Sequence, residues 1–285
     1  MKVDPHALEG IDGKIARAEQ HLATLHREME AWQDREPWTL EPEVHDGGRK
    51  HFWRVRLSEP IPVGWAVVLG EAVHDLRSAL DQAVYWLTID WTGKAVDDSA
   101  FPVCTSGHNF RHWSKKRKRW NGGCHKIRGI GPGPQAFIEA LQPYPQRYRR
   151  SYCFEIRLLN DLWNQDKHRL VHLWGLRFGN AQVRLDKRVE PDCIVGIDRR
   201  LKHDGAIVLK ITCNPPHAEV PMQGEITGML SLVAGKYAGG ASIGLLDMQA
   251  TVGGVIRSLT AAIGHQRDPI ALPESKGRPK PQRLT

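Results

Sequence analysis

Closely spaced cysteine pairs are absent from this sequence of 285 residues, and their absence excludes the commonest cysteine-based metal sites. No CxxC pair occurs, so a zinc knuckle or ribbon is not predicted. The number of cysteines is odd, and their spacing shows no bridging pattern, so we expect reduced thiols and a cytoplasmic protein. The five are scattered along the chain: Cys104, Cys124, Cys153, Cys193 and Cys213.

Long hydrophobic segments are also missing. The first ten residues, MKVDPHALEG, contain no apolar core of the kind that a signal peptide has, so secretion is not expected. The longest apolar run, around Val63–Leu69, is too short to cross a bilayer. The sequence therefore predicts no association with a membrane.

Several signatures of catalytic sites are missing too. There is no GxSxG motif and no evident Cys–His arrangement, so covalent catalysis is not supported. The glycine-rich stretch Gly129–Gly133 lacks both the Lys-Ser/Thr ending and the preceding strand of a phosphate-binding loop. We therefore predict no cofactor and, in the leading interpretation, no bound metal.

The composition is that of a basic globular protein. Hydrophobic residues make up 41% of the chain, which is enough to form a core, and the length suits one large or two modest domains. The formal net charge of +8 favours polyanionic partners such as nucleic acid.

Four segments show the three- and four-residue spacing of apolar side chains that is typical of amphipathic helices. They are residues 8–34, 63–90, 151–174 and 243–263, with a shorter helix at 136–141. Residues 38–58 predict a β-hairpin that turns at Asp46–Gly48. Short alternating runs at 181–185, 193–197, 206–213 and 226–233 predict antiparallel strands.

The predicted fold class is α+β: a bundle of about four long helices, an N-terminal hairpin and a C-terminal antiparallel sheet. We expect a single domain over residues 1–267. Within it, the helical bundle takes residues 8–175 and 243–264, and the sheet region takes residues 176–233. Residues 268–285, rich in Pro, Lys and Arg, predict a disordered basic tail.

The segment Glu155–Trp174 carries polar residues between apolar turns. Asp166 falls inside the apolar arc of this predicted helix. A buried carboxylate is unfavourable unless a cation meets it. If the helix at 63–90 packs against this arc, Arg77 and Lys167 lie where Asp166 needs a counter-charge.

These two helices together supply the candidate site. If the cluster lines a cleft, Arg77 and Lys167 hold a phosphate, and the side chain of a histidine transfers a proton. The two asparagines then orient the substrate, while Asp81 and Asp166 fix the cations. The candidate catalytic residues are His74 and His168, and the candidate binding residues are Arg77, Asp81, Asn160, Asn164, Asp166, Lys167 and Arg169.

Two other functions remain open for the same cluster. In a non-catalytic scaffold, which could dimerise through the bundle, the pairs Arg77–Asp166 and Arg169–Asp81 only set the helix register. A metal-dependent hydrolase would instead use His74, His168 and His172. That hypothesis requires a particular rotation of the helices, because Asp166 and His168 point to different faces.

Residues 108–128 form the most basic segment of the chain. Clustered cations neutralise phosphates, and aromatic faces stack on unpaired bases, so this segment predicts contact with nucleic acid. The alternative is a solvated helix face whose tryptophans turn inward. Its candidate residues are Trp113, Lys115, Lys116, Arg117, Lys118 and Arg119, with Trp120 closing the run.

Four blocks of the sequence resemble an uncharacterised bacterial family that carries HNLRSALD and NxxDKHR motifs in the same order. They are GEAVHDLRSALD at 70–81, FP at 101–102, LQPY at 141–144 and NDLWNQDKHRL at 160–170. The resemblance covers most of residues 60–175 and implies no established activity.

The pair of polar helices is also similar, more distantly, to HEPN helical domains, many of which are RNA-cleaving toxins or nucleotide-binding modules. HEPN nucleases use Arg, four to six residues, and then His. Only Arg119 and His125 approach that spacing here, in a glycine-rich stretch. The leading hypothesis is therefore a cytoplasmic, HEPN-like module that binds RNA or a nucleotide, with ribonuclease activity left open.

Overall fold

The computed structural model describes residues 5–274 except 115–118, 148–149, 168–175, 179–183, 189, 198–203, 224–227 and 235–236. Within these residues the protein is α+β, as the sequence predicted, with long helices and a four-stranded antiparallel sheet. The chain divides into two compact units. One comprises Met1–Ala23, Val68–Val171 and Leu245–Thr285, and the other comprises Thr24–Val67 and His172–Gly244.

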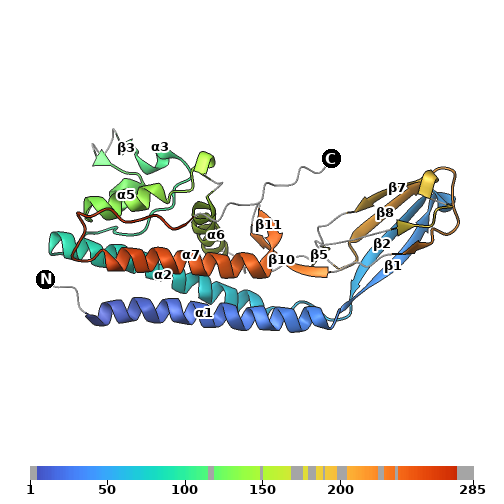
Figure 1. Cartoon of the computed structure of the whole chain (residues 1–285), viewed down its shortest axis with the longest axis horizontal. Coiled ribbons are helices and arrows are strands. Elements are labelled where there is room, and N and C mark those ends of the chain that lie inside the picture. The colour runs from blue at the N-terminus through green and yellow to red at the C-terminus, as the bar shows by residue number, and fades with distance from the viewer. Residues whose placement is uncertain are drawn as a thin grey trace. The chain divides into compact units, whose positions relative to one another are not determined.

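The first unit is helical. Its long helices are α1 (Pro5–Asp34), α2 (Gly64–Thr92), α5 (Pro132–Ala140), α6 (Ser151–Asp166) and α7 (Ala241–Ala261), and the unit boundaries fall inside α1, α2 and α7. Figure 1 shows α1, α2 and α7 running beside one another. The predicted helices at 8–34, 63–90, 136–141 and 243–263 are confirmed. The helix predicted at 151–174 is confirmed to Asp166, and residues 168–174 lie outside the described residues.

The apolar spacing of these helices explains why they pack together. Ile11, Ile15 and Leu22 of α1 are at most 3% exposed, and Leu76 and Leu80 of α2 are fully buried. Each such side chain contributes about 1.5–3 kcal/mol relative to exposure. The short elements α3 (Gly107–Phe110), β3 (Trp113–Ser114), β4 (Arg119–Trp120), α4 (Gly123–Lys126) and η2 (Pro145–Arg147) lie between α2 and α6 in the sequence.

The second unit contains the main sheet. Its strand order is β1-β2-β8-β7, and all neighbouring strands are antiparallel. The strands are β1 (Trp38–His45), β2 (Lys50–Leu57), β7 (Cys193–Ile197) and β8 (Ile207–Cys213). The predicted hairpin is confirmed, and its turn η1 (Asp46–Gly48) has Gly47 and Gly48 at φ of 60° and 93°. The sequence did not predict that β2 pairs with β8, which joins the hairpin to the later strands.

Two smaller sheets and a short helical turn complete this unit. One sheet has the order β11-β10-β5, and the other pairs β6 with β9. Their bounds are β5 (Leu176–Phe178), β6 (Arg184–Leu185), β9 (Met222–Gln223), β10 (Gly228–Ala234) and β11 (Tyr237–Gly240), and η3 covers Glu190–Asp192.

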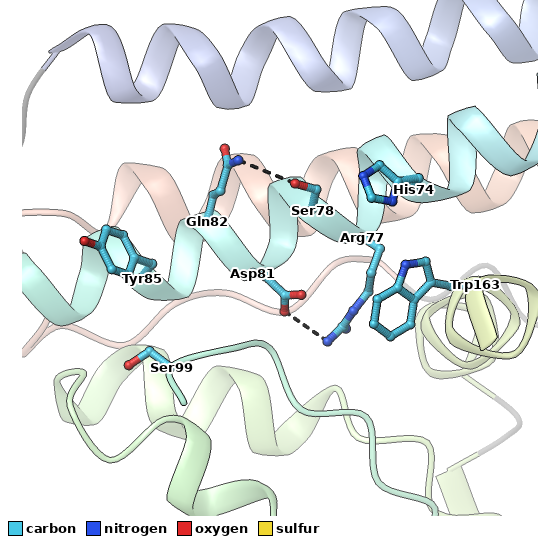
Figure 2. Close-up of a pocket in the computed structure, with 8 residues that line it drawn as sticks. All are labelled: His74, Arg77, Ser78, Asp81, Gln82, Tyr85, Ser99 and Trp163. Atoms are coloured by element: carbon cyan, nitrogen blue, oxygen red, sulfur yellow. Dashed lines mark hydrogen bonds and ion pairs between the residues drawn. The ribbon is translucent and has the colours of Figure 1, made fainter. Parts of the chain in front are cut away.

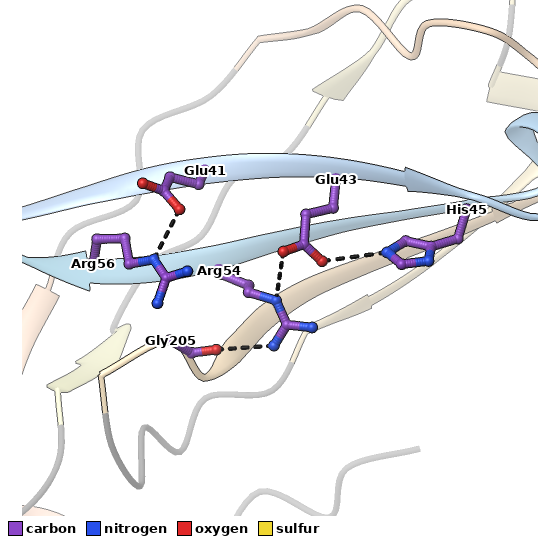
Figure 3. Close-up of polar contacts among 6 residues, drawn as sticks. All are labelled: Glu41, Glu43, His45, Arg54, Arg56 and Gly205. Atoms are coloured by element: carbon purple, nitrogen blue, oxygen red, sulfur yellow. Dashed lines mark hydrogen bonds and ion pairs between the residues drawn. The ribbon is translucent and has the colours of Figure 1, made fainter.

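Ion pairs cross the exposed face of the hairpin (Figure 3). Arg56 Nε donates to Glu41 Oε2 at 2.8 Å, and Arg54 Nε donates to Glu43 Oε1 at 2.8 Å. Arg54 also donates to the carbonyl oxygen of Gly205, at 3.0 Å. The hydrogen bonds from Arg54 and His45 lower the pKa of Glu43. Exposed pairs of this kind contribute little stability, so their effect is to favour one strand register.

One cysteine pair forms a disulfide. Cys193 of β7 and Cys213 of β8 are opposite each other in the strand register and are joined. The expectation of reduced thiols is therefore wrong for this pair, because sequence spacing does not reveal which strands are neighbours. Cys104, Cys124 and Cys153 are free thiols. In the described part of the chain, no helix has both the length and the apolar character needed to cross a membrane.

The glycines of the stretch Gly129–Gly133 permit a close approach of the segment that follows α7. The side-chain oxygen of Gln266 accepts from the Gly131 amide at 2.7 Å, and its amide group donates to the Leu87 carbonyl at 2.8 Å. A Cβ at Gly133 would collide with the carbonyl oxygen of Asp268. This close packing accounts for the glycines of the stretch, and a role in phosphate binding is not needed to explain them.

The chain after Asp268 is described as far as residue 274, so the first part of the predicted disordered tail has a defined path. The amide of Asp268 donates to the His265 carbonyl at 3.0 Å. Residues 275–285 lie outside the described residues, and the disorder predicted there stays a prediction. The single-domain boundaries likewise stay a prediction.

Candidate functional site

One face of α2 forms the floor of a pocket of about 330 Å³ in the first unit. Figure 2 shows its side chains, most of them from successive turns of α2. Trp163 of α6 and Ser99, from the segment between α2 and α3, complete the wall. The lining residues are His74, Arg77, Ser78, Asp81, Gln82, Tyr85, Ser99 and Trp163.

Arg77 and Asp81 hold the main chain at Phe101. Arg77 Nη2 donates to Asp81 Oδ1 at 2.9 Å and to the Phe101 carbonyl at 2.6 Å. The Phe101 amide donates to the same Asp81 oxygen at 2.8 Å. Both polar main-chain groups of Phe101 are therefore paired, and its side chain is fully buried. Phe101 therefore anchors this segment to α2.

The remaining donors of Arg77 have no acceptor in the part of the chain that the structure describes. The residue is 5% exposed, and its Nε and Nη1 atoms are buried without a hydrogen-bond partner among the described residues. The guanidinium faces the Trp163 ring, with Cζ 5.1 Å from the ring centroid. Buried donors without an acceptor are unfavourable. An acceptor oxygen brought within hydrogen-bond distance of these nitrogen atoms would remove that cost.

Further cations lie near Asp81. Burial raises the pKa of Asp81, and Arg77, the Phe101 amide, Lys126 and Lys167 all oppose this rise. Lys167 Nζ also lies 3.1 Å from the centroid of the Trp163 ring. Three cationic side chains, those of Arg77, Lys126 and Lys167, thus act on this end of the pocket, which favours an anionic ligand.

The raised pKa of Asp81 predicts a pH effect on stability. Because its pKa is higher in the folded than in the unfolded protein, the folded state binds the proton more tightly. The contribution of Asp81 to the free energy of unfolding should therefore fall as the pH rises from about 4, the ordinary carboxyl range, through the raised pKa. Urea unfolding of the wild type and of Asp81→Asn across this range isolates the effect. Parallel pH profiles for the two proteins would contradict it.

Asp166 does not meet Arg77, contrary to the prediction. Its carboxylate lies against Gly70 of α2, where a Cβ would approach Asp166 Oδ1 to 2.5 Å. No hydrogen bond or ion pair of Asp166 is found within the described part of the chain. Arg77 pairs instead with Asp81, one turn away on its own helix, which requires no precise approach between helices. The predicted Arg77–Asp166 register pair is therefore wrong.

Only some of the candidate site residues line the pocket. Three of the candidate residues, His74, Arg77 and Asp81, line the pocket. Asn160 and Asn164 of α6 do not line it, and Asn164 is exposed. His168, Arg169 and His172 lie outside the described residues, so their predicted roles are untested.

The basic segment is only partly described. Trp113 pairs with Trp120, and Ser114 with Arg119, across strands β3 and β4. The alternative of a helix face is therefore wrong for these positions. Lys115, Lys116, Arg117 and Lys118 lie outside the described residues, and the predicted nucleic-acid contact stays a prediction.

Five lining residues were not singled out from the sequence: Ser78, Gln82, Tyr85, Ser99 and Trp163. Helical spacing could have found three of them, because Ser78 and Gln82 follow His74 at four-residue steps and Tyr85 follows Asp81 at the same step. Trp163 gave no such signal, since an indole on an apolar arc is usually part of the core.

Among the residues that the structure describes, no group of three or more His, Cys, Asp and Glu side chains could hold a metal ion. The metal-dependent hydrolase relied on His168 and His172, which lie outside those residues, and it remains untested. Comparison with protein-family models, curated proteins and solved structures finds no match to this chain. The family resemblance therefore rests on the sequence blocks alone.

Proposed function

We propose that the α2 pocket binds the phosphate of a nucleotide, either free or as a unit of RNA. The observation that carries this proposal is the buried guanidinium of Arg77 in the wall of the pocket. Two of its nitrogen atoms have no partner among the residues that the structure describes. A phosphate offers several acceptor oxygens to such a group and forms short, charge-assisted hydrogen bonds with it.

The surroundings of Arg77 support the same ligand. Lys126 and Lys167 are close enough to lower the pKa of Asp81, and His74 lies exposed on the pocket face of α2. Trp163 and Tyr85 provide aromatic rings on which a base can stack. A cytoplasmic location belongs to this proposal, since nucleotides and RNA are abundant there.

Ribonuclease activity is a further step of the proposal. His74 would transfer the proton, because it is the histidine that lines the pocket among the described residues. Loss of RNA cleavage in His74→Ala with RNA binding retained would support this role. Unchanged RNA cleavage by the His74→Ala variant would show that His74 does not transfer the proton.

Titration of the protein with adenosine 5′-monophosphate (AMP) and with a short single-stranded RNA tests the phosphate site. Lys167→Ala should weaken the binding of both about tenfold, the effect of losing one charge-assisted interaction. Lys210→Ala, which removes an exposed cation of β8 in the second unit, is the matched control and should change little. Equal effects of the two variants, or no binding by the wild type, would contradict the proposal.

The second candidate function is a non-catalytic scaffold. It is favoured by the hydrogen bonds that join Arg77 and Asp81 to each other and to the main chain of Phe101. On this account the polar pair fixes the segment after α2 against the helix, and dimerisation through the helices remains part of the hypothesis. Substitutions of Arg77 or Asp81 would then lower the stability of the protein. The wild type would either bind no nucleotide or bind it as well as these variants do.

A further inference from the structure

Asp81 presents an unused acceptor to the pocket. Its Oδ1 oxygen accepts from both Arg77 and the Phe101 amide, whereas Oδ2 accepts no hydrogen bond from the described residues. The side chain is 31% exposed and lines the pocket. Figure 2 shows this second oxygen outside the bond to Arg77. Among the described residues, the ion pair therefore leaves two buried nitrogen atoms of Arg77 without an acceptor and one oxygen of Asp81 without a donor.

Three lining residues follow one another along α2 at four-residue steps. Arg77, Asp81 and Tyr85 are each one turn apart, about 6 Å along the helix axis. Figure 2 shows the three in this order on one face. Tyr85 is 38% exposed, so part of its ring is accessible to a ligand.

This order matches the order of groups in a nucleotide, in which the sugar joins the phosphate to the base. With the phosphate at Arg77, the next group along the helix is the sugar, at Asp81. The base then lies at Tyr85, where it can stack on the phenol ring. An acceptor at the sugar position suits a hydroxyl group, since hydroxyls donate hydrogen bonds to carboxylate oxygens.

Building on the proposed phosphate site, we propose that the α2 pocket selects ribonucleotides over deoxyribonucleotides, with Asp81 Oδ2 accepting a hydrogen bond from the ribose 2′-hydroxyl. The hydroxyl is the group by which a protein distinguishes RNA from DNA at a given position. A deoxyribonucleotide leaves Oδ2 unpaired beneath the bound sugar, which lowers its affinity. The pocket volume, about 330 Å³, suits one nucleotide unit at a time.

The test compares AMP, deoxy-AMP and inorganic phosphate as ligands of the full chain by titration calorimetry. Wild type should bind AMP about tenfold more tightly than deoxy-AMP, the effect of one hydrogen bond to a charged group. Asp81→Asn should reduce this ratio to about twofold or less. Its single amide oxygen takes the place of Oδ1, which accepts from Arg77 and the Phe101 amide, so an NH2 donor replaces the Oδ2 acceptor. The matched control is Ser78→Ala, another polar lining residue of α2, which should leave the ratio unchanged.

The remaining outcomes separate this inference from the proposed function. Tyr85→Ala should weaken AMP and deoxy-AMP equally and leave phosphate binding unchanged. AMP and deoxy-AMP could bind with equal affinity, and Lys167→Ala could weaken the binding of both. That result would support the phosphate site and show that the pocket does not select ribose. If Asp81→Asn is folded, as its thermal transition will show, and keeps the wild-type ratio, Asp81 is not the selecting group. If no ligand binds, both proposals fail.

Discussion

Replacing Arg77 with alanine is expected to lower the free energy of unfolding by about 3–5 kcal/mol, the range for breaking a buried ion pair on one side. The substitution leaves the half-buried carboxylate of Asp81 without its cation and the Phe101 carbonyl without a donor. It also removes the guanidinium that faces Trp163. Urea unfolding of the variant and the wild type measures the difference.

The control for this prediction is Arg111→Ala. Arg111 also forms a salt bridge, with Glu139, in the same helical unit, but its side chain is exposed. Pairs at the surface contribute little, so this variant should be close to wild type in stability. If Arg77→Ala and Arg111→Ala have the same effect, then Arg77 does not hold the segment at Phe101.

Replacing Gly133 with alanine is expected to lower the free energy of unfolding by about 1–3 kcal/mol, the usual effect of overpacking. The added Cβ would collide with the carbonyl oxygen of Asp268 and come within 3.0 Å of the carbonyl oxygen of Gln266. Both are main-chain atoms, so they cannot move aside without shifting the segment after α7. The shift would also weaken the bond from the Gly133 amide to the Gln266 carbonyl, now 2.9 Å.

The matched control for this prediction is Gly13→Ala in α1. An added Cβ there meets nothing within 4 Å, and the residue is exposed in the interior of a helix. Alanine should therefore stabilise the protein by about 0.5–1 kcal/mol, through helix propensity alone. Opposite signs for the two variants, measured by thermal unfolding, are the expected result. A stabilised Gly133→Ala would show that α5 and the segment after α7 are not in close contact.

The helices could be predicted from the sequence because their apolar spacing is a local property. Ile11, Ile15 and Leu22 repeat at helical intervals and are buried as expected. The pairing of β2 with β8 could not be predicted in this way. Alternating residues mark a strand, but they do not identify its neighbour when the two are far apart in the chain. The Cys193–Cys213 disulfide was missed for the same reason.

The site was predicted in part. His74, Arg77 and Asp81 were grouped correctly on α2, since helical spacing fixes which residues share a face. The partner of Arg77 was predicted wrongly, because the choice between Asp81 and Asp166 depends on how α6 lies against α2. Gly70 is a signal that was missed: it leaves room for the Asp166 carboxylate against α2.

The proposed nucleotide site lies beside Arg77 and Trp163 in the α2 pocket. The most direct test follows the indole N–H resonance of Trp163 by NMR during a titration with AMP. This resonance can be identified among those of the ten tryptophans by its loss in Trp163→Phe. We predict a saturable shift of the Trp163 resonance, reduced in Lys167→Ala. An unchanged Trp163 resonance at millimolar AMP would show that the nucleotide does not bind in this pocket.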